Sequence, residues 1–173
     1  MKYVAALLAL SYAVPAFACS DITSNTKKYA YQLENEAKEG RVVLCVDDAH
    51  FYTYELENIA KAGGILKIFA DQVSLYTYEV ENLAKAGRVI YEVGAKKIYS
   101  YELENLVKAG ARIKLRASRN EFYGYQIENF AKAAQGGRGG VTLILDSNRF
   151  YNYELSNFRE AGVWIVVPGS DEE

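Results

Sequence analysis

A tyrosine-rich motif recurs six times along this chain at nearly constant spacing. Its fullest copy, FYTYELENIAKAGG, occupies residues 51–64, and the other copies keep a Tyr-x-Tyr pair followed by Asn. The motif Asn residues are 23, 24, 23, 24 and 28 positions apart, and the last interval holds the Gly-rich insertion AQGGRGG. A fixed period of this length is typical of solenoids, in which each unit packs only on its neighbours. We therefore predict six repeats, near 25–48, 49–72, 73–95, 96–118, 119–148 and 149–173.

Each repeat reads as a helix followed by a strand. The first half is rich in Glu, Leu, Ala and Lys, which favour helices, and a Glu lies in most of the expected first turns. A Gly follows where the helix must end, and the second half is a short apolar run such as ILKIF or VTLIL. We expect small polar residues at the helix N-caps, namely Thr53, Thr77, Ser100 and Asn152.

The apolar pattern predicts which faces are buried. Leu56, Ile59 and Ala60 recur at helical spacing and form one apolar stripe. In the strands, one alternating set is apolar throughout and is predicted to face the helices. This set comprises Val42/Leu44, Leu66/Ile68, Val89/Tyr91, Ile113/Leu115, Val141/Leu143 and Trp164/Val166. The other set is mixed and carries charge in the middle strands, as expected for a sheet with one solvent-facing side.

Strands joined through a helix in units of one length should be parallel, and similar units should turn the same way. The chain is therefore predicted to be a single-domain α/β solenoid over residues 19–173, with one parallel sheet and helices on one side only. A doubly wound sheet is the alternative fold. It requires central strands that are apolar on both faces, which Lys67, Glu92 and Lys114 contradict.

The two ends of the repeat array depart from the pattern. In the first repeat, Lys28 and Glu36 replace residues that are apolar elsewhere, as expected for a capping unit. The last strand, Val163–Val167, is apolar on both faces. We expect it to form an exposed edge that can pair with another copy of the chain, which makes a homo-oligomer through Val163–Val167 one of the predicted assemblies.

The first 18 residues, MKYVAALLALSYAVPAFA, read as a secretory signal with an A-x-A cleavage site. The apolar run is too short to span a membrane, and a secreted or periplasmic location is expected. Cleavage would leave Cys19 at the new N-terminus. It then forms a disulfide with Cys45, carries a lipid anchor, or stays a free thiol, and the sequence leaves these alternatives open.

The repeated motif offers one candidate binding surface. Six Asn residues inside helices need a cause, and we expect a buried ladder in which their amides bond neighbouring helices. The alternative is an outward row of Asn and second-position Tyr side chains that binds a repetitive partner such as a glycan. The first Tyr of each pair is expected to pack in the connecting turn. The candidate binding residues are Tyr54, Asn58, Tyr78, Asn82, Tyr101 and Asn105.

The open sheet face offers a second candidate surface. Lys67, Lys114 and Arg116 are predicted to surround Glu92, with Phe69 nearby, either as cross-strand charge pairs or as a ligand site. Asp47, Asp71 and Asp146 occupy equivalent places after their strands. We expect them to cap local turns, with Ca²⁺ binding as the alternative.

No catalytic constellation is evident. His50 is the only His, and the Gly-rich insertion lacks the Lys-Ser/Thr ending of a phosphate-binding loop. The net charge is −2 without a basic block, which argues against a nucleic-acid partner. We therefore predict an exported binding module for a protein or cell-envelope polymer, with no enzyme activity, cofactor or bound metal. The alternative is an assembly protein that pairs through its last strand.

Overall fold

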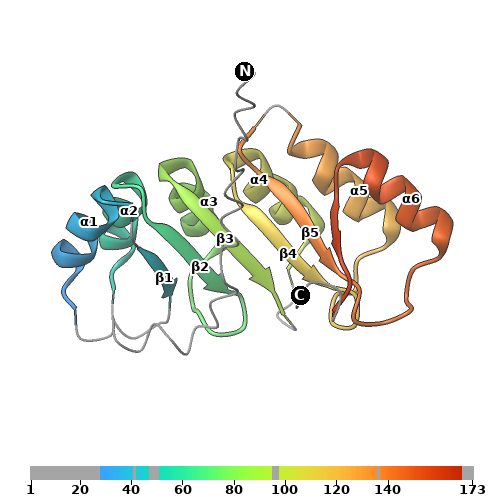
Figure 1. Ribbon diagram of the computed structural model, residues 1–173, viewed down its shortest axis with the longest axis horizontal. Helices are drawn as coiled ribbons and strands as arrows, with labels where there is room; N and C mark the ends of the chain where they lie inside the picture. Colours follow the sequence, from blue (N-terminus) through green and yellow to red (C-terminus); the bar gives the residue numbers. More distant parts are fainter. Residues whose placement is uncertain (1–27, 41, 47–50, 95–97, 136, 169–173) are drawn as a thin grey trace, which may run out of the picture.

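The computed structural model describes residues 28–40, 42–46, 51–94, 98–135 and 137–168. Helices and strands alternate along this part of the chain, as predicted (Figure 1). The elements are α1 (Ala30–Lys38), β1 (Val43–Val46), α2 (Thr53–Lys61), β2 (Ile65–Phe69), α3 (Thr77–Ala86), β3 (Arg88–Val93), α4 (Ser100–Ala109), β4 (Arg112–Arg116), α5 (Gly124–Ala133), β5 (Gly140–Ile144), α6 (Asn152–Ala161) and β6 (Trp164–Val166).

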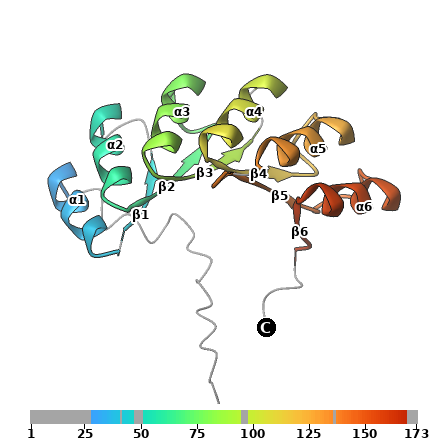
Figure 2. The same ribbon diagram turned by 90° about the horizontal axis from the view of Figure 1, so that it is seen from above.

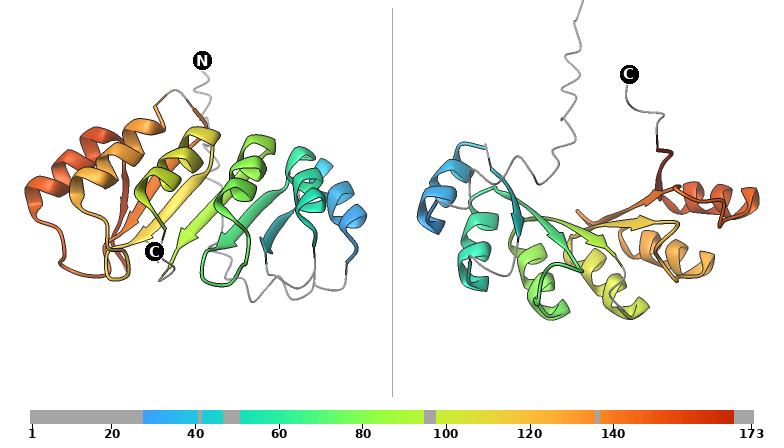
Figure 3. Two further views of the ribbon diagram at one scale, coloured as in Figure 1. Left: turned by 180° about the vertical axis from the view of Figure 1, so that it is seen from behind. Right: turned by 90° about the horizontal axis from the view of Figure 1, so that it is seen from below.

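The six strands form one parallel sheet in sequence order, β1 to β6. All six helices cover the same face, and the molecule bends into an arc with the helices outside and the sheet inside (Figures 2 and 3). The curvature has a simple cause, since packed helices lie about 8–10 Å apart and paired strands about 4.8 Å apart. The predicted α/β solenoid is confirmed, and the doubly wound alternative is wrong because the helices of the described residues all lie on one sheet face (Figure 2).

The core lies between the helices and the sheet. Leu56 and Ile59 on α2 are 1% and 0% exposed, and the facing strand residues Leu66 and Ile68 on β2 are also fully buried. Equivalent residues in the other repeats extend this contact into one continuous core. Each unit is therefore stabilised because its apolar stripe is buried against the sheet and the neighbouring units, which is the general behaviour of solenoids.

The helices begin one residue earlier than the sequence suggested. The first Tyr of each pair is the N-cap, as Tyr52 is in α2, and the small polar residue expected there is the first helical residue. The N-cap N–H of Tyr52 donates to the Glu55 carboxylate at 2.9 Å, so the cap is supplied by the third helical residue. The residues wrongly assigned to the cap are Thr53, Thr77, Ser100 and Asn152.

The displaced threonines join neighbouring repeats instead. Thr53 Oγ1 donates to Glu79 Oε1 at 2.9 Å, and Thr77 Oγ1 donates to Glu102 Oε1 at 2.8 Å. The second oxygen of Glu102 accepts the N–H of the N-cap Tyr99 at 2.8 Å. A single carboxylate thus caps its own helix and bonds the preceding helix, which ties the register of two repeats together.

The first repeat is a cap, as predicted, and its two unusual residues contact each other. Lys28 Nζ lies 2.8 Å from Glu36 Oε1. In later repeats the same two positions hold apolar partners, for example Phe122 and Phe130, whose rings meet edge to face at 5.2 Å. The exchange of an apolar contact for an ion pair keeps the geometry while making the outer side of α1 polar.

The last strand is shifted by one residue relative to the prediction. Trp164 pairs with Thr142 and is 70% exposed, whereas Val163 is 5% exposed. The open face therefore carries Trp164 and Val166, and the expected helix-facing pair Trp164/Val166 is wrong. A one-residue slip inverts every side chain of a strand, and an all-apolar strand gives no pattern that reveals the slip. Val163 belongs to the core, so the exposed edge is limited to β6.

The Gly-rich insertion between α5 and β5 contacts the neighbouring helices. Arg138 Nη2 donates to the Lys85 carbonyl at the end of α3, at 3.2 Å. Its side chain passes close to Gly110, which ends α4 with φ of +109°. The Arg138 cation thus lies where the C-terminal carbonyls of a helix favour positive charge.

Several predictions concern residues outside the described ranges. The signal peptide at 1–18 and the fate of Cys19 remain predictions, as does the role of Asp47. Cys45 lies half-buried on β1. Within the described ranges, no helix is long and apolar enough to cross a membrane.

Candidate functional site

Twelve exposed tyrosines line the edge of the solenoid where the helices begin, and we call them the tyrosine row. The row consists of the pairs Tyr29/Tyr31, Tyr52/Tyr54, Tyr76/Tyr78, Tyr99/Tyr101, Tyr123/Tyr125 and Tyr151/Tyr153. Each side chain is 59–73% exposed. The expectation that the first Tyr of each pair packs into the turn is therefore wrong. The apolar residue just before it, such as Phe51, packs against the core instead.

Each pair is stacked. The ring centroids lie 5.7–6.0 Å apart, and the ring planes differ by 7–13°. The backbone explains the stacking, because the first Tyr is an N-cap with extended geometry, φ near −73° and ψ near 153° in α2. Two residues both inside a helix point about 200° apart when they are two positions apart. The extended N-cap removes this divergence and sets the two rings side by side.

The six motif Asn residues are also exposed, so the predicted buried ladder is wrong. Asn58 lies one turn beyond Tyr54 on the same helix, on the solvent side. Next to it, Glu57 and Lys61 form an ion pair one helical turn apart, with Oε1 and Nζ 2.6 Å apart. Such pairs recur on α1, α3, α4 and α5, while carboxylates outside these pairs, such as Glu55 and Glu79, give the helix side a net negative charge. The alternative interpretation, an outward row of Tyr and Asn, fits the structure. The row includes Tyr54, Tyr78, Tyr101, Asn58, Asn82 and Asn105.

Hollows separate successive tyrosine pairs. One hollow of about 490 Å³ lies between the starts of α3 and α4, walled by Tyr76 and Tyr78 on one side and Tyr99 and Tyr101 on the other. Tyr91 from β3 also lines it. Burial, together with the nearby negative charges of Glu102 and Asp71, raises the pKa of Tyr91 to about 12. The phenol therefore stays protonated near neutral pH and can donate a hydrogen bond.

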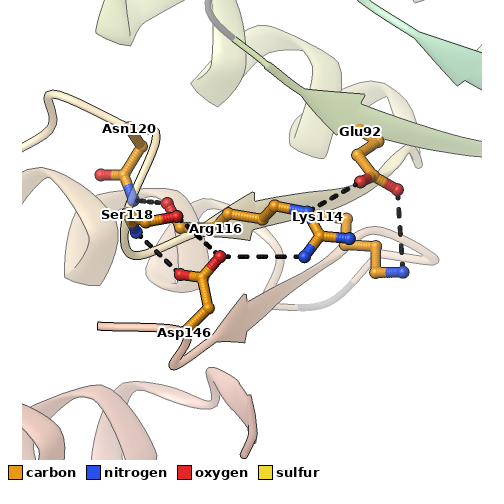
Figure 4. A network of polar contacts seen from close by, with 6 residues as sticks. All are labelled: Glu92, Lys114, Arg116, Ser118, Asn120 and Asp146. Carbon is orange, nitrogen blue, oxygen red and sulfur yellow. Dashed lines mark hydrogen bonds and ion pairs between the residues drawn. The ribbon is translucent and has the colours of Figure 1, made fainter. Parts of the chain in front are cut away.

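The second candidate surface, on the open sheet face, is organised around one carboxylate (Figure 4). Glu92 on β3 lies 3.7 Å from Lys114 Nζ and 3.3 Å from Arg116 Nε, both on β4. The predicted cross-strand charge pairing is therefore present. Lys67 lies on the neighbouring strand, where burial and then the positive charge of Lys114 lower its pKa. Phe69 pairs with Glu92 in the strand register.

The loop after β5 extends this network. The Asp146 carboxylate accepts hydrogen bonds from the Ser118 N–H at 2.8 Å and from its hydroxyl at 2.7 Å, and lies 3.8 Å from Arg116 Nη1. The hydrogen bonds from Ser118 are one reason that the pKa of Asp146 is lowered, since they oppose the effect of burial. Asp146 thus bonds the turn of the preceding repeat, whereas the sequence predicted a cap of its own local turn.

One polar contact was missed by the sequence reasoning. Asn120 is 4% exposed, and its amide donates to the Arg116 carbonyl. Arg149 from the next repeat donates to Asn120 Oδ1 at 3.4 Å and to the Phe122 carbonyl at 3.1 Å. These positions lie in turns without a repeated residue type, so no periodic signal marks them.

No protein family model and no curated protein matches this sequence. The geometry alone therefore defines the class, an open α/β solenoid with an aromatic outer edge and a charged inner face. Among the described residues, no group of three or more acidic, His or Cys side chains is placed to hold a metal ion. The tyrosine row and the open sheet face are the two surfaces on which a function can be based.

Proposed function

We propose that this chain is an exported binding module that holds an extended, uncharged cell-envelope polymer on the tyrosine row. The observation that supports this is the strictness of an exposed pattern. The tyrosines are identical in all six repeats although each is at least 59% exposed. The buried residue four positions after the first Tyr varies among Leu, Val and Ile, as in Leu56, Val80 and Ile127. Folding alone gives no reason for exposed Tyr residues to vary less among the six repeats than buried core residues do.

The chemistry of the row suits an unbranched glycan. Tyrosine rings give apolar platforms with a hydroxyl at the rim, and the Asn amides supply both donors and acceptors. The Glu–Lys pairs beside the row compensate each other, and the capping carboxylates of Glu55 and Glu79 add negative charge, which favours a neutral partner over a polyanion. Neighbouring pairs repeat with the helix packing distance of about 8–10 Å, so a polymer with a similar repeat meets the same environment at each helix.

The test uses the purified mature chain and an array of unbranched neutral glycans, followed by calorimetry on any glycan retained. The central variant replaces Tyr76, Tyr78, Tyr99 and Tyr101 with Ala. Each ring contact is worth on the order of 1 kcal/mol, so a loss of at least tenfold in affinity is expected. A control variant, Glu104→Ala with Lys108→Ala, changes the exposed surface of the same helix without touching the row.

The result that rejects the proposal is clear. A glycan that binds the variant with four central Ala residues as tightly as it binds the unchanged chain does not use the centre of the row, which contradicts the proposal. Binding of an extended protein, with no neutral glycan retained, keeps the row as the binding surface but shows that the partner is the other expected class. Replacing the four tyrosines by Phe separates ring stacking from hydroxyl bonding, because only the latter is removed.

The second candidate function is assembly through the last strand. Trp164 is 70% exposed on β6, a three-residue strand at the end of the sheet. An unpaired edge with a large exposed ring is a site where a second copy can add. Val163 is buried and belongs to the core, so a change there would test folding rather than assembly. Trp164→Lys should instead abolish any dimer seen by light scattering, and a chain that is monomeric before the change does not assemble there.

A further inference from the structure

The open sheet face is more basic than the rest of the molecule. In the described strands, the side chains on this face include five basic residues and one acidic residue, Glu92. The basic residues are Lys67, Arg88, Arg112, Lys114 and Arg116. The whole chain carries a net charge of −2. Positive charge is therefore concentrated on the inner face, and the potential there favours an anionic partner.

Three of these cations form a line along one strand. Arg112, Lys114 and Arg116 occupy every open-face position of β4. Alternate residues of a strand are about 6.6 Å apart, so the line presents positive charge at that interval. β4 is hydrogen-bonded to β3 on one side and to β5 on the other. A ligand lying on β4 cannot add to the sheet and must contact this face through its side chains.

A hollow adjoins one end of the line. It has a volume of about 360 Å³ and is lined by Arg112, Thr142 and Trp164 together with Gly140 and Gly162. Gly140 faces open space, which leaves room between the guanidinium and the exposed indole. A cation at one wall and an aromatic ring at the other suit an anionic group that carries an apolar neighbour.

Glu92 shows how a carboxylate is accommodated here. It lies within 3.7 Å of both Lys114 and Arg116, while its side chain is 16% exposed. Asp146 also lies 3.8 Å from Arg116, so the two carboxylates face Lys114 and Arg116, and the excess positive charge on β4 comes from the exposed Arg112. The pKa of Lys67 is lowered mainly by burial and then by the positive charge of Lys114, while Glu92 opposes the shift.

We infer that the open sheet face binds an extended acidic peptide whose carboxylates alternate along its chain, with an apolar side chain in the hollow beside Trp164. The spacing supports this choice of partner. Alternate side chains of an extended peptide also recur at about 6.6 Å, so successive carboxylates meet Arg112, Lys114 and Arg116 in turn. This site lies on the opposite side of the sheet from the helices and does not depend on the proposed role of the tyrosine row.

The assay uses the fluorescence of Trp164, which is the only Trp in the chain. The probe is a Trp-free peptide with Glu at alternate positions and a terminal Phe, and the comparison peptide has the same composition with its Glu residues in one block. We expect the alternating peptide to bind at least about threefold more tightly, and its affinity to fall as salt is raised. Equal affinities for the two peptides overturn the inference, because they indicate only general attraction of opposite charges.

Two variants give opposite expectations. Arg112→Gln removes an exposed cation and should weaken binding about threefold. Glu92→Gln removes the internal carboxylate that competes for Lys114 and Arg116, and should tighten binding by a similar factor. The control, Lys61→Gln with Lys108→Gln, removes two charges from the helix side and should leave the affinity unchanged.

The remaining outcomes also decide the question. A weaker or unchanged affinity in a folded Glu92→Gln variant contradicts the inference, as does tight binding of polyphosphate without binding of the peptide. Folding of each variant is checked by circular dichroism. The variant with Ala at Tyr76, Tyr78, Tyr99 and Tyr101 should retain full peptide affinity, so failure of the tyrosine-row proposal is distinguishable from failure of this one.

Discussion

Replacing one tyrosine pair by Ala should hardly change the stability of the fold. Tyr76 and Tyr78 are 67% and 62% exposed, so only about a third of each ring is removed from water. A stacked pair contributes about 0.5–1.5 kcal/mol when well packed, and less when the rings are this exposed. Tyr78 lies inside the first turn of α3, where Ala is the better helix former by up to about 0.7 kcal/mol. These terms oppose each other, and the expected net change is within about 0.5 kcal/mol.

The matched comparison is Leu103→Ala on the neighbouring helix. Leu103 is 0% exposed, and a buried Leu→Ala change costs about 2–5 kcal/mol. For a domain of this size, each kcal/mol lowers the melting temperature by about 2–4 °C. We therefore expect a drop of about 4–20 °C for Leu103→Ala and of no more than about 2 °C for the tyrosine pair.

Urea unfolding followed by far-ultraviolet circular dichroism measures both variants without relying on tyrosine signals. A loss above about 2 kcal/mol for Tyr76→Ala with Tyr78→Ala would show that the row is part of the scaffold. The strictness of the tyrosine pattern would then have a structural cause, and the main support for the binding proposal would be lost. A small loss leaves binding as the reason to keep the rings.

Three further outcomes follow from individual contacts. Glu102→Ala removes the helix cap and the bond from Thr77, so the free energy of unfolding measured with urea should fall by about 1–2 kcal/mol. The control is Glu104→Ala, which loses only a carboxylate 4.0 Å from Lys108 and should lower the same free energy by about 0.3 kcal/mol. Asn120→Ala should cost about 0.5–1.5 kcal/mol by the same measurement, because it removes the side-chain bond to the Arg116 carbonyl, which still accepts from two backbone N–H groups, and breaks the contact with Arg149. Tyr91 has a folded-state pKa of about 12, above the unfolded value near 10, so its contribution is complete below pH 10 and is lost as the pH rises toward 12. Urea unfolding at pH 9 and 11.5 should therefore show a steeper loss for the unchanged chain than for Tyr91→Phe.

The repeat period was enough to predict most of the fold. Units of one length, each with a helical half and a strand half, leave only a parallel sheet with the helices on one side. The buried positions were also readable, because Leu56 and Ile59 keep helical spacing and Leu66 and Ile68 alternate in the strand. These features depend on periodicity, which is the strongest structural signal in a single sequence.

The errors arose where a single residue decides the geometry. A small polar residue such as Thr53 is a good N-cap by composition, yet the cap is Tyr52 because Glu55 supplies the bond to its N–H. That one-residue difference moved the first Tyr of each pair from the expected turn to the surface. In β6 the same kind of shift exposed Trp164, since a strand that is apolar on both faces does not encode its own register.

The two surfaces differ in the spacing that they offer to a partner. Tyrosine pairs follow the helices, about 8–10 Å apart, whereas open-face side chains follow strands about 4.8 Å apart and residues about 6.6 Å apart along β4. A polymer that repeats about every 8–10 Å matches only the tyrosine pairs of the outer edge. An extended peptide, whose alternate side chains are about 6.6 Å apart, matches only the side chains along β4. The two proposed ligands therefore fall on different surfaces of one curved scaffold and are not expected to compete. Simultaneous binding of a neutral glycan and an alternating acidic peptide, each with the affinity that it has alone, is the arrangement that this geometry favours.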